Sequence, residues 1–75
     1  MKPDARKYHN PDPQYLCGLL KEAGLNRSEA ARLLGLSRVG FSNYLRDPSE
    51  PLYRVASYPV QFALECLVRF KEEKL

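Results

Sequence analysis

Four side chains near the middle of the chain are of types that read the edges of DNA bases. They are Arg38, Val39, Ser42 and Asn43. Arg pairs with guanine, Asn pairs with adenine, and an apolar side chain such as Val contacts the methyl group of thymine. At about 100° per residue these four positions fall on or beside one face of a helix. The opposite face is apolar and holds Phe41, Tyr44 and Leu45. We predict a recognition helix with these four residues as its base-reading candidates.

A second set of residues has the chemistry to bind phosphate. Every basic residue from Arg27 to Arg69 is Arg, and Lys occurs only before and after this stretch. Arg holds a phosphate through two parallel hydrogen bonds, which Lys does not do. Hydroxyl groups and the free amides at a helix start also bind phosphate and fix the register of a protein on DNA. The phosphate candidates are Arg27, Ser28, Ser37, Arg46 and Arg54.

The segment 26–46 must position these side chains, and its pattern is that of two short helices joined by a turn. Asn26 stands three residues before Glu29 in a capping-box arrangement that predicts a helix start. Gly35 ends that helix, and Ser37 caps the next one. A small residue four positions before the glycine, Ala31, allows the two helices to approach closely. Ala30, Ala31, Leu33 and Leu34 form the predicted inward face. The spacing predicts a helix-turn-helix.

The rest of the chain is expected to form an arm, one earlier helix and a loop. Residues 1–11 are polar and hold two prolines, which predicts a flexible basic N-terminal arm. Asp12 and Pro13 start a helix that runs to Ala23 and stops at Gly24. Prolines after Arg46 predict an exposed loop. Within that loop, we expect three residues to cover the core: Leu52, Tyr53 and Val55.

The last predicted helix opens at Pro59 and is apolar on nearly every side. One small core cannot cover so much apolar surface, so a second buried face is implied. We expect a two-fold dimer that presents its recognition helices about 34 Å apart and reads an inverted repeat. The interface candidates are Phe62, Cys66, Val68, Arg69 and Phe70. The predicted fold is all-α, a small helix-turn-helix DNA-binding domain of four to five helices, with residues 12–75 forming this domain and its C-terminal dimerisation helix.

Composition narrows the classes of function. Twelve basic and nine acidic residues give a net charge of +3, which suits a polyanionic partner. Cys17 and Cys66 are widely separated within apolar patterns, so we expect reduced, buried packing residues and no metal site. No apolar run approaches the ~20 residues that span a bilayer. A single histidine, His9, and no phosphate loop argue against an enzyme. We expect no cofactor and a cytoplasmic location, associated with the nucleoid of a bacterial host.

Three segments resemble a known family. They are PDPQYLCGLLKEAGLN, AARLLGLS and YPVQFALECL, and they are similar to the anti-CRISPR-associated helix-turn-helix repressors of phages and mobile elements, in particular the first-described class. The similarity covers about Asn10 to Leu67. It implies a homodimeric repressor that binds inverted repeats of double-stranded DNA in the promoter of an anti-CRISPR operon and limits transcription of that operon, including its own gene.

The DNA-facing positions depart from that family. Its members carry more arginine at the start of the second helix and within the recognition helix, where this chain has Ser28, Glu29 and Val39. Arg27 and Arg38 lie one residue away, a displacement of about 100° around a helix. The operator sequence therefore does not follow from the resemblance. An alternative function is a protein-interaction module, an adaptor or an inhibitor, that uses the same scaffold.

Overall fold

Local side chains and two left-handed glycines set the limits of the helices in the computed structural model, which describes residues 2–73. Asp12 accepts a hydrogen bond from the Gln14 amide at 2.9 Å, and Ser37 accepts one from the Gly40 amide at 3.0 Å. Gly24 and Gly35 have φ of 71° and 73° at two helix ends. The helices are α1 (Ala5–Tyr8), α2 (Pro13–Ala23), α3 (Arg27–Leu34), α4 (Arg38–Tyr44) and α5 (Tyr58–Glu73).

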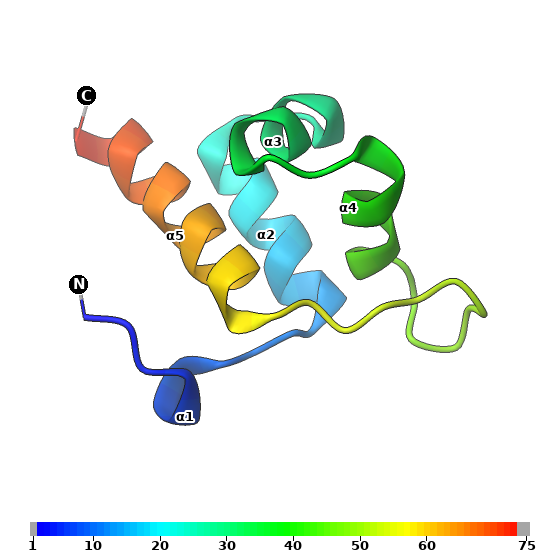
Figure 1. The fold of residues 1–75 in the computed structure, drawn as a ribbon. Coiled ribbons are helices and arrows are strands. Elements are labelled where there is room, and N and C mark those ends of the chain that lie inside the picture. The colour runs from blue at the N-terminus through cyan, green and yellow to red at the C-terminus, as the bar shows by residue number, and fades with distance from the viewer. Residues whose placement is uncertain (1, 74–75) are drawn as a thin grey trace.

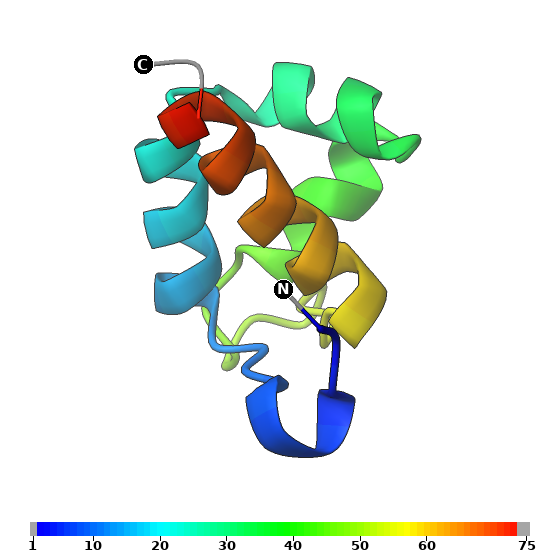
Figure 2. The ribbon, with the colours of Figure 1, turned by 90° about the vertical axis from the view of Figure 1, so that its left-hand side faces the viewer.

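The described residues form five helices and no strand, which confirms the predicted all-α class. Helices α2 and α5 lie side by side and run in the same general direction, while α3 crosses one end of the pair (Figures 1 and 2). Helix α4 follows α3 and packs against it. The buried core draws on α2 to α5 and consists of Leu16, Leu19, Leu20, Ala23, Ala30, Ala31, Phe41, Leu45, Ala56, Leu64 and Val68.

The predicted capping box at the start of α3 is confirmed. The Asn26 side chain accepts from the Glu29 amide at 2.8 Å, and the Glu29 carboxylate accepts from the Asn26 amide at 3.0 Å. The predicted limits of α2 and α3 are also confirmed, and α5 begins at Tyr58, one residue before the predicted start. Neighbouring residues make these caps, so local sequence determines them.

The predicted flexible arm, residues 1–11, contains defined structure over the part that is described. Residues 5–8 form one helical turn, capped by Asp4. The turn lies beside the start of α5, because Gln61 Nε2 donates to the Tyr8 carbonyl at 2.8 Å and the Asn10 amide donates to Gln61 Oε1 at 2.7 Å. A polar residue of α5 therefore holds the arm. Met1 of the predicted arm, and residues 74 and 75 of the predicted domain, lie outside the described residues.

Several apolar residues lie where the sequence did not predict them. Leu33 was predicted inward and is exposed. Helix α3 buries Ala30 and Ala31, and Leu33 lies about 200° around the helix from Ala31. Leu52 and Val55 were expected to cover the core, and both are exposed on the loop 45–57. Cysteines 17 and 66 are both free, as predicted; the first is half-buried, but the second is exposed rather than buried.

Gly35 allows a direct test of the turn between α3 and α4. We expect Gly35→Ala to lower the free energy of unfolding by about 1–2 kcal/mol, because a side chain disfavours the left-handed conformation. Space is not the reason, since a Cβ at Gly35 would meet nothing within 4 Å. Gly18 within α2 is the matched control, with equally open space but ordinary helical backbone. Gly18→Ala should instead raise stability by about 0.5–1 kcal/mol. Urea unfolding of both variants tests this, and equal effects would contradict it.

Candidate nucleic-acid interface

Helix α4 presents two of the four base-reading candidates fully to solvent. Arg38 and Val39 occupy its first two positions, and the side chain of Val39 is 71% exposed. Phe41 is fully buried and Leu45 nearly so, which anchors the other side of the helix to the core. The predicted division of this helix into an inner and an outer face is confirmed at these positions.

The other two base-reading candidates are less accessible. Ser42 and Asn43 are half-buried, toward the end of α4. Asn43 Oδ1 accepts a hydrogen bond from Arg46 Nε at 2.9 Å, and the Asn43 carbonyl accepts one from the Arg54 amide at 3.1 Å. Asn43 thus joins α4 to the following loop. To bind adenine, the Asn43 side chain would have to break its hydrogen bond with Arg46, or keep that bond and bind the base at the same time.

The phosphate candidates have different surroundings. Arg27, Ser28, Ser37 and Arg54 are exposed, whereas Arg46 is half-buried. The Arg46 guanidinium also lies 3.6 Å from the Glu50 carboxylate, in an ion pair of partly exposed groups. Because that pair is open to water, it is worth at most about 1 kcal/mol and is screened by salt. Breaking this ion pair would therefore cost little, although Arg46 Nε also donates to Asn43.

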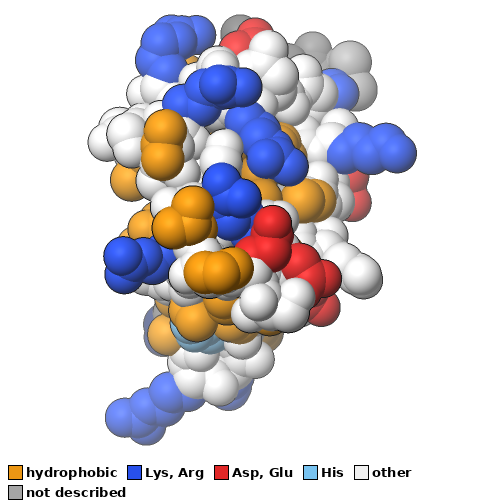
Figure 3. Space-filling model, turned by 90° about the vertical axis from the view of Figure 1, so that its right-hand side faces the viewer, with side chains coloured by type: hydrophobic (Ala, Val, Ile, Leu, Met, Phe, Trp, Pro, Cys, Tyr) orange, Lys and Arg blue, Asp and Glu red, His pale blue; other side chains and the backbone are white. Residues whose placement is uncertain are grey.

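The face that carries α4 and the loop is mixed in character. Lys and Arg side chains spread over it, hydrophobic side chains lie between them, and acidic side chains gather on one side (Figure 3). In the loop, Ser49 donates to the Asp47 carboxylate from its amide and its hydroxyl, at 2.9 and 2.6 Å. These hydrogen bonds lower the pKa of Asp47. Asp47 therefore keeps a negative charge next to Arg46 in the sequence.

No protein-family model and no curated protein matches this sequence. Within residues 2–73 no three metal-ligating side chains gather into a cluster. None of the helices in that part of the chain is long and apolar enough to cross a lipid bilayer.

The exposed side of α5 carries most of the predicted interface residues. Cys66, Arg69 and Phe70 are exposed and Phe62 is half-buried, and these four line a shallow hollow of about 450 Å³ together with Glu73. Val68 is the exception: it is 7% exposed and belongs to the core of its own chain. Its assignment to an interface was wrong, because α5 turns this position toward α2.

Two features of α5 were missed from the sequence. Gln61 is fully buried, and Glu65 is half-buried beside Tyr15. A signal for them was present, since Gln61 shares the spacing i, i+3, i+7 with Leu64 and Val68 and so falls on the buried stripe of the helix. A polar residue on such a stripe needs hydrogen-bond partners. The arm supplies them.

Proposed function

We propose that this protein is a sequence-specific DNA-binding transcriptional repressor. In this proposal α3 and α4 form a helix-turn-helix, and α4 enters the major groove with Arg38 and Val39 foremost. The observation that carries it is the combination of a three-residue connection, residues 35–37, with a short second helix buried on one side and exposed at its amino end. In such proteins the early residues of the second helix contact the bases.

The proposed DNA contacts combine reading and positioning. Arg38 would bind a guanine edge and Val39 would contact a thymine methyl group. Ser42 and Asn43, nearer the loop, are the less accessible candidates for base contacts. The arginines that flank this helix add the positive charge that a phosphate backbone requires. Arg27 and Ser28 begin α3, where free amides also favour an anion. Glu29, in the first turn of α3, carries a negative charge that would repel a phosphate there. Its carboxylate accepts a hydrogen bond from the Asn26 amide in the capping box.

We further propose that two copies associate through α5. The hollow on its exposed side is lined by apolar groups and by one basic and one acidic residue, Arg69 and Glu73, four positions apart. Two such helices packed about a two-fold axis would set opposite charges against each other and cover Phe62 and Cys66. The dimer would then bind an inverted repeat. The resemblance to repressors of anti-CRISPR operons supports the same arrangement, including control of its own gene in a phage or mobile element.

The test measures binding to the DNA upstream of the protein's own gene across a series of salt concentrations. We expect the logarithm of the affinity to fall with the logarithm of salt by about 0.9 for each phosphate contacted. A DNA with the full inverted repeat should bind more tightly than one with a single half-site, which reports the dimer. Absent or salt-insensitive binding would contradict the proposal.

Arg38 offers the sharper test, with its own matched control. We expect Arg38→Ala to weaken operator binding by about 1–3 kcal/mol, because a bidentate contact is lost. Arg38→Lys retains the charge but not the paired hydrogen bonds, so it should keep binding to unrelated DNA and lose preference for the operator. Gel-shift titrations of both variants on operator and scrambled DNA distinguish these outcomes. Unchanged preference in both would remove the recognition role from α4.

One observation favours the alternative function, a protein-interaction module that serves as an adaptor or inhibitor. Three apolar side chains on α4 and the loop are more than half exposed: Val39, Leu52 and Val55. Exposed apolar side chains are common singly, but a group of them is typical of a surface that another protein covers. The salt series separates the two functions, because a protein interface of this kind carries no counterion release.

A further inference from the structure

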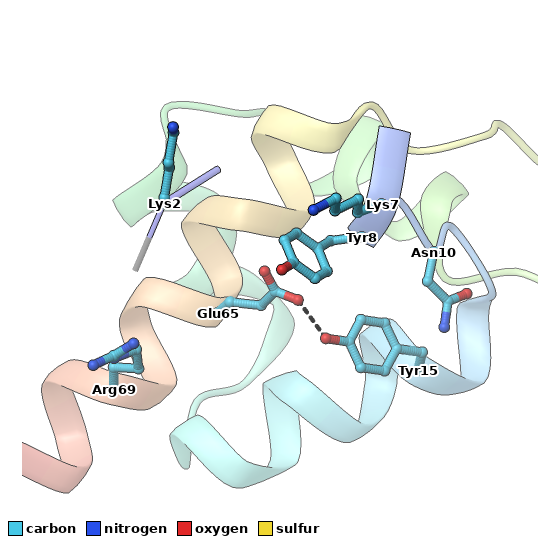
Figure 4. Close-up of a pocket in the computed structure, with 7 residues that line it drawn as sticks. All are labelled: Lys2, Lys7, Tyr8, Asn10, Tyr15, Glu65 and Arg69. Atoms are coloured by element: carbon cyan, nitrogen blue, oxygen red, sulfur yellow. Dashed lines mark hydrogen bonds between the residues drawn. The ribbon is translucent and has the colours of Figure 1, made fainter. Parts of the chain in front are cut away.

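A hollow of about 610 Å³ lies between the arm, α2 and α5. None of its lining residues belongs to α3 or α4. Three basic side chains, two tyrosines and one carboxylate line it (Figure 4). These residues are Lys2, Lys7, Arg69, Tyr8, Tyr15 and Glu65, and Asn10 completes the lining. They come from three segments that are distant in sequence. Only the docked position of the arm brings them together.

The carboxylate of Glu65 is incompletely satisfied. Its Oε2 accepts hydrogen bonds from the Tyr15 hydroxyl and, at 3.1 Å, from Gln61 Nε2. Its Oε1 is buried and has no hydrogen-bond partner in the structure. A buried acceptor without a donor costs about 1–3 kcal/mol, so native proteins rarely retain one without a reason. Solvent does not reach this oxygen in the structure, so a ligand N–H group can bond to it only by displacing the atoms that cover it.

Tyr15 holds this carboxylate in place. Burial and the hydrogen bond to Glu65 raise the pKa of Tyr15 to about 12. Its hydroxyl therefore remains protonated at neutral pH and keeps donating to Oε2. Figure 4 shows this bond and shows Glu65 pointing toward both tyrosines. The free oxygen is thus fixed in orientation before any ligand arrives.

The charge around the hollow selects an anion. Lys2, Lys7 and Arg69 outnumber the single carboxylate, so a simple cation would be repelled. A phosphate would satisfy the basic groups. Tyr8 is 55% exposed, and its ring offers a surface on which a flat ring can stack. Nucleotides carry all three of these groups: a phosphate, a flat ring and an N–H donor.

We propose that this hollow binds a free mononucleotide, with its phosphate toward the basic side chains, its base against Tyr8, and a base N–H donated to Glu65 Oε1. Guanosine monophosphate is the suitable probe, because the guanine edge carries adjacent N–H donors. The site shares no residue with α4, but Arg69 also lines the hollow on α5 that we propose for dimerisation, so nucleotide binding is tested separately from DNA binding. A nucleotide at the hollow would also hold the arm against α2 and α5.

Calorimetric titration of the full chain with guanosine monophosphate tests the proposal. We expect binding, with ribose 5-phosphate and guanosine each at least about tenfold weaker, because each lacks half of the recognised groups. Glu65→Gln should weaken nucleotide binding about tenfold or more, since it places an N–H group opposite the base donor. Absence of binding, or equal binding of ribose 5-phosphate, would overturn the proposal. Equal binding of ribose 5-phosphate would mean that the hollow binds the phosphate and does not recognise the base.

Two neighbouring residues of α1 provide a matched pair. Lys7 lines the hollow and Arg6 does not, although both are exposed and carry one positive charge. Lys7→Ala should weaken nucleotide binding about threefold or more through loss of one charge contact, and Arg6→Ala should leave it unchanged. Because both side chains are exposed, neither variant threatens the fold. Equal effects would mean general charge attraction and would contradict a defined site.

Discussion

Phe41→Ala is expected to lower the free energy of unfolding by about 3–5 kcal/mol, because a fully buried ring leaves a cavity that neighbouring residues fill only in part. Phe41 belongs to α4, on the buried side of that helix, and is 0% exposed. A chain of 75 residues has a total stability of about 4–11 kcal/mol, so this loss removes a large part of it. We expect the variant to be partly unfolded at physiological temperature. Urea unfolding followed by circular dichroism measures the change.

Val39→Ala is the control for that experiment, because it shortens an apolar side chain on the same helix. Val39 is exposed, so its loss should change stability by no more than about 0.5 kcal/mol. A similar cost for both variants would mean that α4 is not packed as described. If Val39→Ala weakens DNA binding while leaving stability unchanged, the reading and packing sides of α4 are separate.

Gln61→Ala should have the second largest effect, about 2–4 kcal/mol, because it removes hydrogen bonds to the arm and leaves a buried gap. The residue is 0% exposed and bonds to Tyr8, Asn10 and Glu65. The arm is expected to detach. Hydrogen exchange at the Asn10 amide, which donates to Gln61, should become markedly faster, and proteolysis within residues 2–11 should follow.

Gln14→Ala serves as the control, since Gln14 is exposed on α2. It removes the same side chain without affecting the arm and should leave Asn10 exchange unchanged. Protected exchange in the Gln61 variant would show that other contacts hold the arm. The structure provides two candidates: His9 Nε2 lies 2.9 Å from the Ala56 carbonyl, and the Asp4 amide donates to Tyr58.

The helix limits could be predicted from sequence because their causes are local. A cap at Asp12, Asn26 or Ser37 depends on an amide two or three residues away, and these pairs are visible in the printed sequence. The outward position of Arg38 and Val39 likewise follows from helical period and the apolar residues opposite. Both signals act within one element.

The remaining features depend on contacts across the chain. The hydrogen bonds from Gln61 to the arm join residues more than fifty positions apart, and no short sequence pattern predicts them. Leu33 and Leu52 failed as core residues for a related reason: periodicity identifies a face of a helix or loop, but not whether another element covers it. The hollow at Glu65 could not be predicted from the sequence either, because it forms only when the arm, α2 and α5 pack together.

The exposed amino end of α4 has an evolutionary consequence. In the described part of the chain, the side chains of Arg38 and Val39 form none of the identified hydrogen bonds or ion pairs and take no part in the core. Substitutions there should cost little stability. In the proposed repressor, selection could therefore alter the DNA preference of this surface through single mutations while the scaffold beneath it stays constant. A repressor built in this way could diverge as quickly as its operator sequences.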